Sequence, residues 1–174
     1  MTVTFAAYGD SLTATPSISW VPEASDGVEA SHIGGFSYGG YRSYQVAANT
    51  VSCPANVTVV MVGTNDVSNA MWRVPLVDTL NAIRDIIVKS SASKALIVAI
   101  PPRNDGFHVE AAQLNIDIRN YAISMGWLWV DPWTSLRTSD NKFRAGWTTD
   151  GIHPTPAGGT WVGHWLHHMI LASV

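Results

Sequence analysis

Two short stretches of this sequence have the composition of β-strands that are buried on both faces. Val57 to Val62 and Ala95 to Ile100 are almost continuous runs of apolar residues, without the polar alternation of a half-exposed strand. Strands of this kind occur mainly in parallel sheets that carry helices on both sides. The two runs therefore favour an α/β fold.

The rest of the chain alternates between strand and helix patterns. We expect strands at 3–8, 29–33, 57–62, 95–100 and 127–130, and helices at 43–49, 75–89, 110–125 and 156–171. Residues 14–27 are rich in Ser, Thr and Pro and are expected to form a surface loop that carries Trp20, and residues 34–40 to form a glycine-rich loop. Alternating strands and helices imply right-handed crossovers and a parallel sheet covered on both faces.

Length and charge limit the classes of protein to consider. The 174 residues are enough for one domain with a real core, so we expect residues 1–174 to form a single domain. A hydrophobic share of 47% with 13% charged residues is typical of a soluble globular protein, and a net charge of −3 argues against nucleic-acid binding. We expect no signal peptide and no membrane span, which fits a cytoplasmic protein or a domain cut from a larger one. Cys53 is the only cysteine, so an internal disulfide is excluded and the redox compartment is left open, as is the oligomeric state.

Polar side chains follow the ends of several predicted strands. Ser11 comes after the first strand, Asn65 after the third, and Asp150 and His153 after the fifth. Because the carboxyl ends of parallel strands share one edge of a sheet, we expect these side chains to lie close together.

Ser11, His153 and Asp150 are the residue types of a nucleophile, its base and the carboxylate that orients the base. A serine at the start of a helix is more often a plain cap, and a lone histidine beside a proline is more often a surface residue. The three together favour catalysis. Asp66 is an alternative partner for the histidine, although its position beside Asn65 favours a role in bracing the loop, and Asp10 is expected to brace the turn of the nucleophile.

Acyl transfer also needs hydrogen-bond donors for the oxyanion of the tetrahedral intermediate, each contributing on the order of 3 kcal/mol. The candidates are the backbone N–H of Ser11, a backbone N–H in the glycine-rich loop and the side-chain amide of Asn65. An asparagine in such a turn is also a common turn former.

Three short motifs together resemble the SGNH (GDSL-type) hydrolase family over nearly the whole chain. They are Gly9-Asp10-Ser11-Leu12, Gly63-Thr64-Asn65-Asp66 and Asp150-Gly151-Ile152-His153-Pro154. The resemblance implies a three-layer α/β/α sandwich with a mostly five-stranded parallel sheet, as in flavodoxin. It also implies ester hydrolysis through an acyl-Ser11 intermediate, with no metal or organic cofactor. The segment Gly39-Gly40-Tyr41-Arg42-Ser43 resembles the family's glycine block less closely; it points to Gly40 as an oxyanion donor and leaves Gly39 open.

Other residues are candidates for binding. Tyr41 and Arg42 are expected to line an acyl or alcohol pocket, and Trp147, three residues before Asp150, is placed to stack on a sugar ring. His164 with His167 or His168 has a spacing that a metal can use, but no carboxylate or cysteine accompanies them, so we expect no metal site and a half-exposed terminal helix.

The sequence therefore predicts a small serine esterase acting on a small-molecule or glycan ester, with a short acyl group such as acetyl. The same residues would also serve a thioesterase, a lysophospholipase or an acyltransferase. A non-catalytic carbohydrate-binding module with loop tryptophans is the alternative outside the enzymes.

Overall fold

The computed structural model describes residues 1–174 and contains one five-stranded sheet. The strands are β1 (Val3–Gly9), β2 (Ala30–Ser37), β3 (Val57–Met61), β4 (Lys94–Val98) and β5 (Leu128–Val130). Their order is β2-β1-β3-β4-β5, and every neighbouring pair is parallel. The helices are α1 (Ser11–Ala14), α2 (Val21–Ala24), α3 (Ser43–Asn49), α4 (Leu76–Ser90), α5 (His108–Ser124), α6 (Pro156–Leu171) and the 3-10 turn η1 (Thr134–Leu136).

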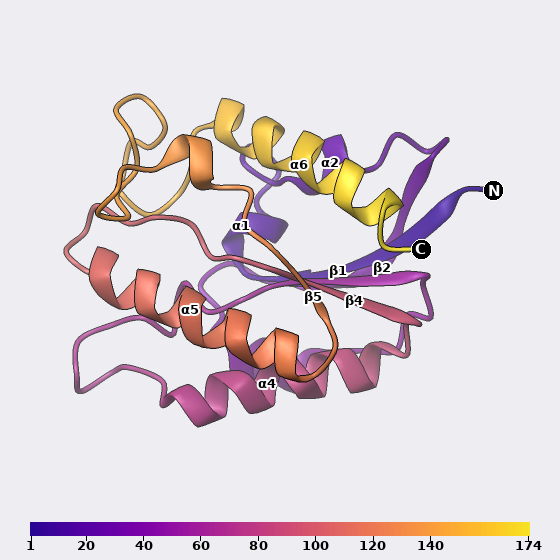
Figure 1. Cartoon of the computed structure of the whole chain (residues 1–174), viewed down its shortest axis with the longest axis horizontal. Coiled ribbons are helices and arrows are strands. Elements are labelled where there is room, and N and C mark those ends of the chain that lie inside the picture. The colour runs from indigo at the N-terminus through magenta and orange to yellow at the C-terminus, as the bar shows by residue number, and fades with distance from the viewer.

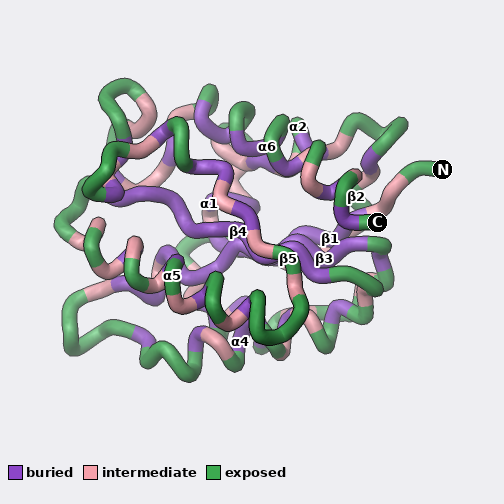
Figure 2. Tube along the Cα trace, viewed as in Figure 1, coloured by how far each residue is buried: buried purple, intermediate pink, exposed green.

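The helices cover both faces of the sheet, as Figure 1 shows: α2 and α6 lie on one side, and α4 and α5 on the other. Successive residues of β1 point to opposite faces, so that Phe5 and Ala7 belong to one core and Ala6 and Tyr8 to the other. Burial is concentrated along the strands between the two helical layers (Figure 2). The predicted three-layer α/β/α sandwich is confirmed.

Each core combines sheet residues with one helical layer. The first joins β1, β3 and β4 to apolar residues of α6: Val162, Leu166 and Ile170. The second joins the sheet to residues of α3, α4 and α5: Val46, Ile83, Ile86 and Ile118. None of the helices has both the length and the apolar composition needed to span a membrane.

Local sequence explains where α6 begins. Thr155 is its N-cap, and the Thr155 hydroxyl accepts a hydrogen bond from the Gly158 N–H at 3.4 Å. Pro156 occupies the first helical position, where its missing N–H costs nothing. The predicted and observed bounds of α6 agree, and so do those of α3.

The expectation of a surface loop over residues 14–27 was wrong. The segment contains the last residue of α1 and the whole of α2, and Trp20 is only 1% exposed. Its indole N–H donates to the Thr13 hydroxyl at 3.1 Å, and its ring stacks on Phe5. Trp133 is also in the core, whereas Trp72 is exposed. The Ser- and Pro-rich composition of this segment concealed short helices that bury one large aromatic side chain.

The glycine-rich loop is shorter than predicted, because β2 continues to Ser37 and takes in Gly34 and Gly35. Gly35 pairs with Ala7 of β1, and a Cβ on Gly35 would collide with the Ala7 carbonyl group. Glycine therefore serves strand pairing here, and only the residues after β2 form the loop that faces Ser11.

Candidate active site

Ser11 lies at the end of β1, as the first residue of α1. Asp10 caps this short helix, and its Oδ1 accepts a hydrogen bond from the Leu12 N–H at 3.0 Å. The Ser11 N–H donates no hydrogen bond within the protein. The turn thus presents both a hydroxyl group and a free N–H at the carboxyl edge of the sheet.

His153 lies within hydrogen-bond distance of Ser11, although 142 residues separate them in the sequence: Ser11 Oγ is 2.9 Å from His153 Nε2. On the other side of the ring, His153 Nδ1 lies 2.6 Å from Asp150 Oδ2. With the proton on Nδ1, the ring donates to the carboxylate, and Nε2 can accept the serine proton. The three side chains therefore form one continuous path for a proton.

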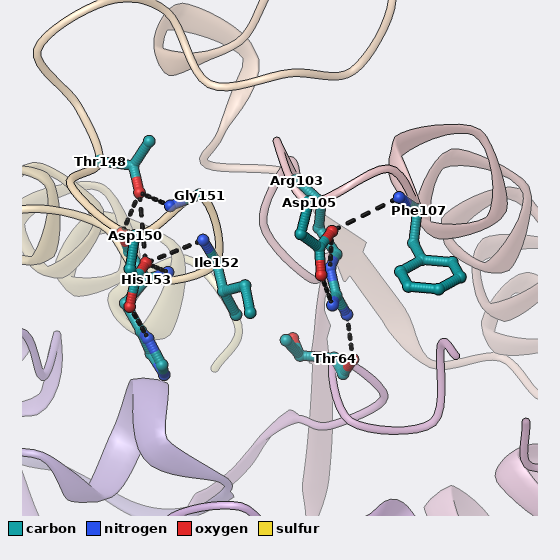
Figure 3. Close-up of polar contacts among 9 residues, drawn as sticks. All are labelled: Thr64, Arg103, Asp105, Phe107, Thr148, Asp150, Gly151, Ile152 and His153. Carbon is teal, nitrogen blue, oxygen red and sulfur yellow. Dashed lines mark hydrogen bonds and ion pairs between the residues drawn. The ribbon is translucent and has the colours of Figure 1, made fainter. Parts of the chain in front are cut away.

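The loop before α6 holds Asp150 and His153 in place through its own hydrogen bonds (Figure 3). Asp150 Oδ1 accepts from the backbone N–H groups of Ile152 and His153, at 2.9 and 2.8 Å. The Thr148 hydroxyl donates to the His153 carbonyl oxygen at 2.7 Å and accepts from the Gly151 N–H at 2.9 Å. The carboxylate and the imidazole are thus fixed relative to each other by the backbone.

These contacts also set the ionisation of Asp150. Partial burial opposes the charge, but the N–H groups of His153 and Ile152 and the imidazole outweigh it, and the pKa of Asp150 is lowered to about 2. Asp150 is a carboxylate throughout the range in which a histidine exchanges its proton.

The turn after β2 brings two further N–H groups to Ser11. The Tyr41 N–H donates to the Tyr38 carbonyl oxygen at 3.3 Å, with Gly40 at φ +77°, a conformation that favours glycine. Neither the Gly39 nor the Gly40 N–H has a partner in the protein. A Cβ on Gly39 would lie 3.9 Å from the Ser11 Cβ, so this turn faces the hydroxyl directly.

Asn65 joins the same group of donors. It follows β3 and donates one side-chain N–H to the Tyr41 carbonyl oxygen at 2.9 Å. The four predicted strand-end residues, Ser11, Asn65, Asp150 and His153, are therefore gathered at one edge of the sheet with the turn that contains Gly39 and Gly40.

Asp66 braces the loops, as expected, and does not contact His153. Its carboxylate is buried and accepts hydrogen bonds from the N–H and the hydroxyl of Ser43, at 2.9 and 2.5 Å, and from the Thr79 hydroxyl at 2.7 Å. The start of α3, the Asn65 turn and α4 are thus tied to one carboxylate.

Asp10 is fully buried, and its second carboxylate oxygen has no hydrogen-bond partner. Burial raises the pKa of Asp10 to about 7, and the nearby charge of Asp66 adds to this effect, while the Leu12 N–H and His153 act in the opposite direction. Asp10 therefore changes its charge near neutral pH beside the candidate nucleophile.

The three predicted binding residues lie in different places. The backbone of Tyr41 is at the site, where its carbonyl oxygen accepts from Asn65; its ring lies 4.5 Å from that of Tyr38 and packs against the second core. Arg42 lines a hollow on the surface of α3 and α4. Trp147 packs against the core under α6. The structure thus brings Tyr41 to the candidate site.

Sequence reasoning missed two features beside the site. Tyr38 is 57% exposed and pairs with Tyr41; its position directly before the glycine pair was the available signal. A surface hollow of about 320 Å³ also borders His153, between the loop after α1 and the loop before α6. Its lining includes Thr15, Ser17, Ile18, Pro154 and Pro156.

Two of the three histidines of α6 contact the segment around α2 and the start of β2. His164 lies 3.6 Å from Glu23 and His167 lies 3.7 Å from Glu29, measured from Nε2 to the carboxylate. Asp26, Glu29 and His167 each place a possible ligand atom within 4.8 Å of the others. Asp26 and Glu29 directly precede β2 in the chain, so this cluster lies at the opposite edge of the sheet from Ser11.

Comparisons with known proteins agree with this architecture. A structure of a G-D-S-L family protein from Desulfitobacterium hafniense superposes with a TM-score of 0.78 at 16% identity, covering 95% of this chain and 98% of the other. The inhibitor-bound aryl esterase of M. smegmatis gives 0.75 at 18% identity, with 99% and 100% coverage. Est24, a carbohydrate acetylesterase from Sinorhizobium meliloti, gives 0.69 at 16% identity, with 98% and 99% coverage.

A search of curated proteins finds no match to the chain. A sequence model of the GDSL-like Lipase/Acylhydrolase family matches residues 7–160, which contain Ser11, Asn65, Asp150 and His153. The chain therefore belongs to the GDSL-like lipase/acylhydrolase family.

Proposed function

We propose that residues 1–174 act as one serine esterase domain that hydrolyses carboxylic esters of short acyl groups through an acyl-Ser11 intermediate. The observation that carries this proposal is the hydrogen-bonded path from Ser11 through His153 to Asp150, with lengths of 2.9 and 2.6 Å. Both distances lie in the range that proton transfer between heavy atoms requires.

In the first half of the cycle, Ser11 Oγ attacks the ester carbonyl carbon while its proton passes to His153 Nε2. Asp150 stabilises the imidazolium that forms. The former carbonyl oxygen, now negatively charged, accepts hydrogen bonds from the N–H of Ser11, the N–H of Gly40 and the free N–H of the Asn65 amide. Gly39 is the alternative to Gly40, because both N–H groups are unpaired in the protein.

Collapse of this intermediate breaks the bond to the alcohol, whose oxygen takes the proton from His153. A water molecule then repeats the attack on the acyl group, with His153 first accepting its proton and then returning a proton to Ser11 Oγ. Every bond change is assigned to a residue of this chain, so the proposed cycle needs no metal or organic cofactor.

The surroundings of His153 favour a small ester. The hollow beside it, about 320 Å³, is bordered by short hydroxyl side chains and two prolines, and His153 and Asp150 are themselves 35% and 51% exposed. An open rim of this kind offers little apolar surface to a long acyl chain, and acetyl is the group we favour. The exposed ring of Tyr38, backed by the half-buried ring of Tyr41, suits a sugar or aryl alcohol, in keeping with the aryl esterase and the carbohydrate acetylesterase that share the fold.

The decisive experiment compares wild-type protein with Ser11→Ala and Ser139→Ala on nitrophenyl acetate and nitrophenyl decanoate. We expect acetate turnover that Ser11→Ala lowers by at least about 10⁴-fold, because the covalent route is lost, while Ser139→Ala matches the wild type. Faster turnover of decanoate would favour a lipase or lysophospholipase. A folded wild type without Ser11-dependent turnover, paired with binding of glycans, would favour the carbohydrate-binding alternative.

A further inference from the structure

A buried arginine lies between the turn that carries Asn65 and the loop that carries His153. Arg103 follows β4 and is only 6% exposed. Figure 3 shows its guanidinium group beside Asp105 and pointing at Thr64, separate from the side chains of the Thr148–His153 loop. None of the motifs read from the sequence includes it.

The guanidinium holds the Asn65 turn directly. Arg103 Nη1 donates to the Thr64 carbonyl oxygen at 2.6 Å, and Thr64 immediately precedes Asn65. Asp105 fixes the guanidinium itself, through a 3.0 Å hydrogen bond from Nε to Oδ1 and an ion pair between Nη2 and Oδ2. A two-point contact with a carboxylate sets the plane of the group as well as its position.

The same segment also touches the loop of the proposed base. The N–H of Asn104, the next residue, donates to the Gly151 carbonyl oxygen at 2.7 Å. Gly151 lies between Asp150 and His153 in the chain. Residues 103–105 therefore connect the proposed oxyanion donor to the proposed acid–base loop through short polar contacts.

We propose that Arg103 is a positioning residue that holds the Asn65 amide on the oxyanion by anchoring the Thr64 carbonyl group. This inference rests on the proposed esterase function. Arg103 does not touch the substrate; it acts through the peptide bond next to Asn65. A donor moved by about 1 Å loses much of its effect on a developing charge, so loss of the anchor lowers kcat more than it raises KM.

The chain offers a matched control. Arg137 and Asp131 form a similar ion pair, 2.6 Å long, after β5, with side chains 26% and 21% exposed. Neither residue contacts Ser11, Asn65 or the Asp150–His153 loop. Arg137→Gln removes an arginine–aspartate pair of the same kind without disturbing the Asn65 turn.

A double-mutant cycle tests the proposal through nitrophenyl acetate kinetics. We expect Arg103→Gln to lower kcat by about 30-fold with KM changed less than about 2-fold, and Arg137→Gln to match the wild type. In an Asn65→Ala background, Arg103→Gln should lower kcat by less than about 3-fold, because the donor that Arg103 positions is already absent. An equal loss in both backgrounds, or no loss in either, overturns the proposal.

Two further measurements distinguish a failure of the Arg103 proposal from an unfolded variant and from a failure of the proposed esterase function. Arg103→Lys keeps the charge but not the planar two-point contact, so we expect a kcat between those of the wild type and Arg103→Gln. Arg103→Lys replaces Arg103→Gln in the cycle if Arg103→Gln does not fold.

The Asn65 side-chain NH₂ signal in a ¹⁵N NMR spectrum, identified by its loss in Asn65→Ala, should shift in Arg103→Gln and stay in place in Arg137→Gln. This signal tests the positioning role even if the wild type shows no turnover, which alone would count against the proposed function. An unmoved signal contradicts the proposal.

Discussion

The side-chain amide of Asn65 donates one N–H to the carbonyl oxygen of Tyr41, at 2.9 Å. A primary amide has two N–H bonds at a fixed angle, so this contact orients the second one. It also joins the turn after β3 to the turn after β2, in which Gly39 and Gly40 hold two unpaired N–H groups. A neighbouring backbone thus aims the candidate oxyanion donor before any substrate arrives.

Asn65→Ala is expected to lower kcat by about 10²- to 10³-fold with little change in KM, because the lost hydrogen bond forms mainly in the transition state. The measurement is steady-state hydrolysis of nitrophenyl acetate. Asn69→Ala is the control, since Asn69 lies in the same loop and its side chain only accepts from the Met71 N–H. A loss carried mainly by KM would place Asn65 in ground-state binding instead.

Asp150→Asn should reduce kcat by about 10³-fold, because the ring of His153 loses both its charge partner and the acceptor that fixes its tautomer. Asp140→Asn serves as the matched control in the same kinetic assay: Asp140 pairs with Lys142 at 2.9 Å and does not contact His153. Equal activities of the Asp150→Asn variant and the wild type would mean that another group orients the ring.

The pH dependence of activity follows from the ionisation of Asp150. With its pKa lowered to about 2, Asp150 stays charged from about pH 3 upward, so protonation of Asp150 does not contribute to acid inactivation above about pH 3. A plot of log(kcat/KM) against pH should therefore show no inflection near pH 3.8, the ordinary pKa of an aspartate. An inflection near pH 3.8 would show that the hydrogen bonds to Asp150 do not lower its pKa.

Alanine substitutions of Gly39 and Gly40 should have different effects, a steric one at Gly39 and backbone strain at Gly40. Gly40 has φ +77°, so Gly40→Ala should lower the free energy of unfolding by about 1 kcal/mol. Gly39 lacks a positive φ, so Gly39→Ala should leave stability nearly unchanged, but its methyl group would face Ser11 at 3.9 Å and obstruct the acyl group. Urea unfolding measures the stability of both variants, and ester hydrolysis measures their activity. A loss of stability in Gly39→Ala but not in Gly40→Ala would contradict the prediction.

Much of the fold was predictable, because burial and periodicity agree over the longer elements. The run Val57 to Val62 has no polar face and became a central strand, and α6 carries both its cap and its proline in the sequence. The region around Trp20 was not predictable in the same way. A four-residue helix has no measurable period. Trp20 is buried against Phe5 and Thr13, and these contacts are defined only by tertiary structure.

The candidate site likewise contains residues that were predictable from the sequence and residues that were not. The positions of Ser11, Asn65, Asp150 and His153 follow from the rule that parallel strands share a carboxyl edge, together with the family motifs. Arg103 has no such signal: its role depends on a contact with a carbonyl oxygen 39 residues away, which no spacing in the sequence encodes. The same holds for the environment of Asp10, whose burial comes from the surrounding layers and not from its neighbours in the chain.

The burial of Asp10 predicts how the free energy of unfolding depends on pH. The pKa of Asp10 is raised from 3.8 to about 7 in the native state, so between about pH 4 and pH 7 the native protein retains a proton that the unfolded chain has released. The contribution of this carboxyl group is therefore fully present below about pH 4 and is lost as the pH rises through 7. Asp10→Asn keeps an acceptor for the Leu12 N–H but cannot ionise.

The free energy of unfolding of Asp10→Asn, relative to the wild type, should therefore increase by on the order of 2 to 4 kcal/mol between pH 4 and pH 8. Urea denaturation of both proteins across this range measures the difference. Asp140→Asn is the control, because the pKa of Asp140 is lowered to about 2 and its effect is constant above about pH 4. A constant difference between Asp10→Asn and the wild type would mean that Asp10 ionises as readily in the native protein as in the unfolded chain.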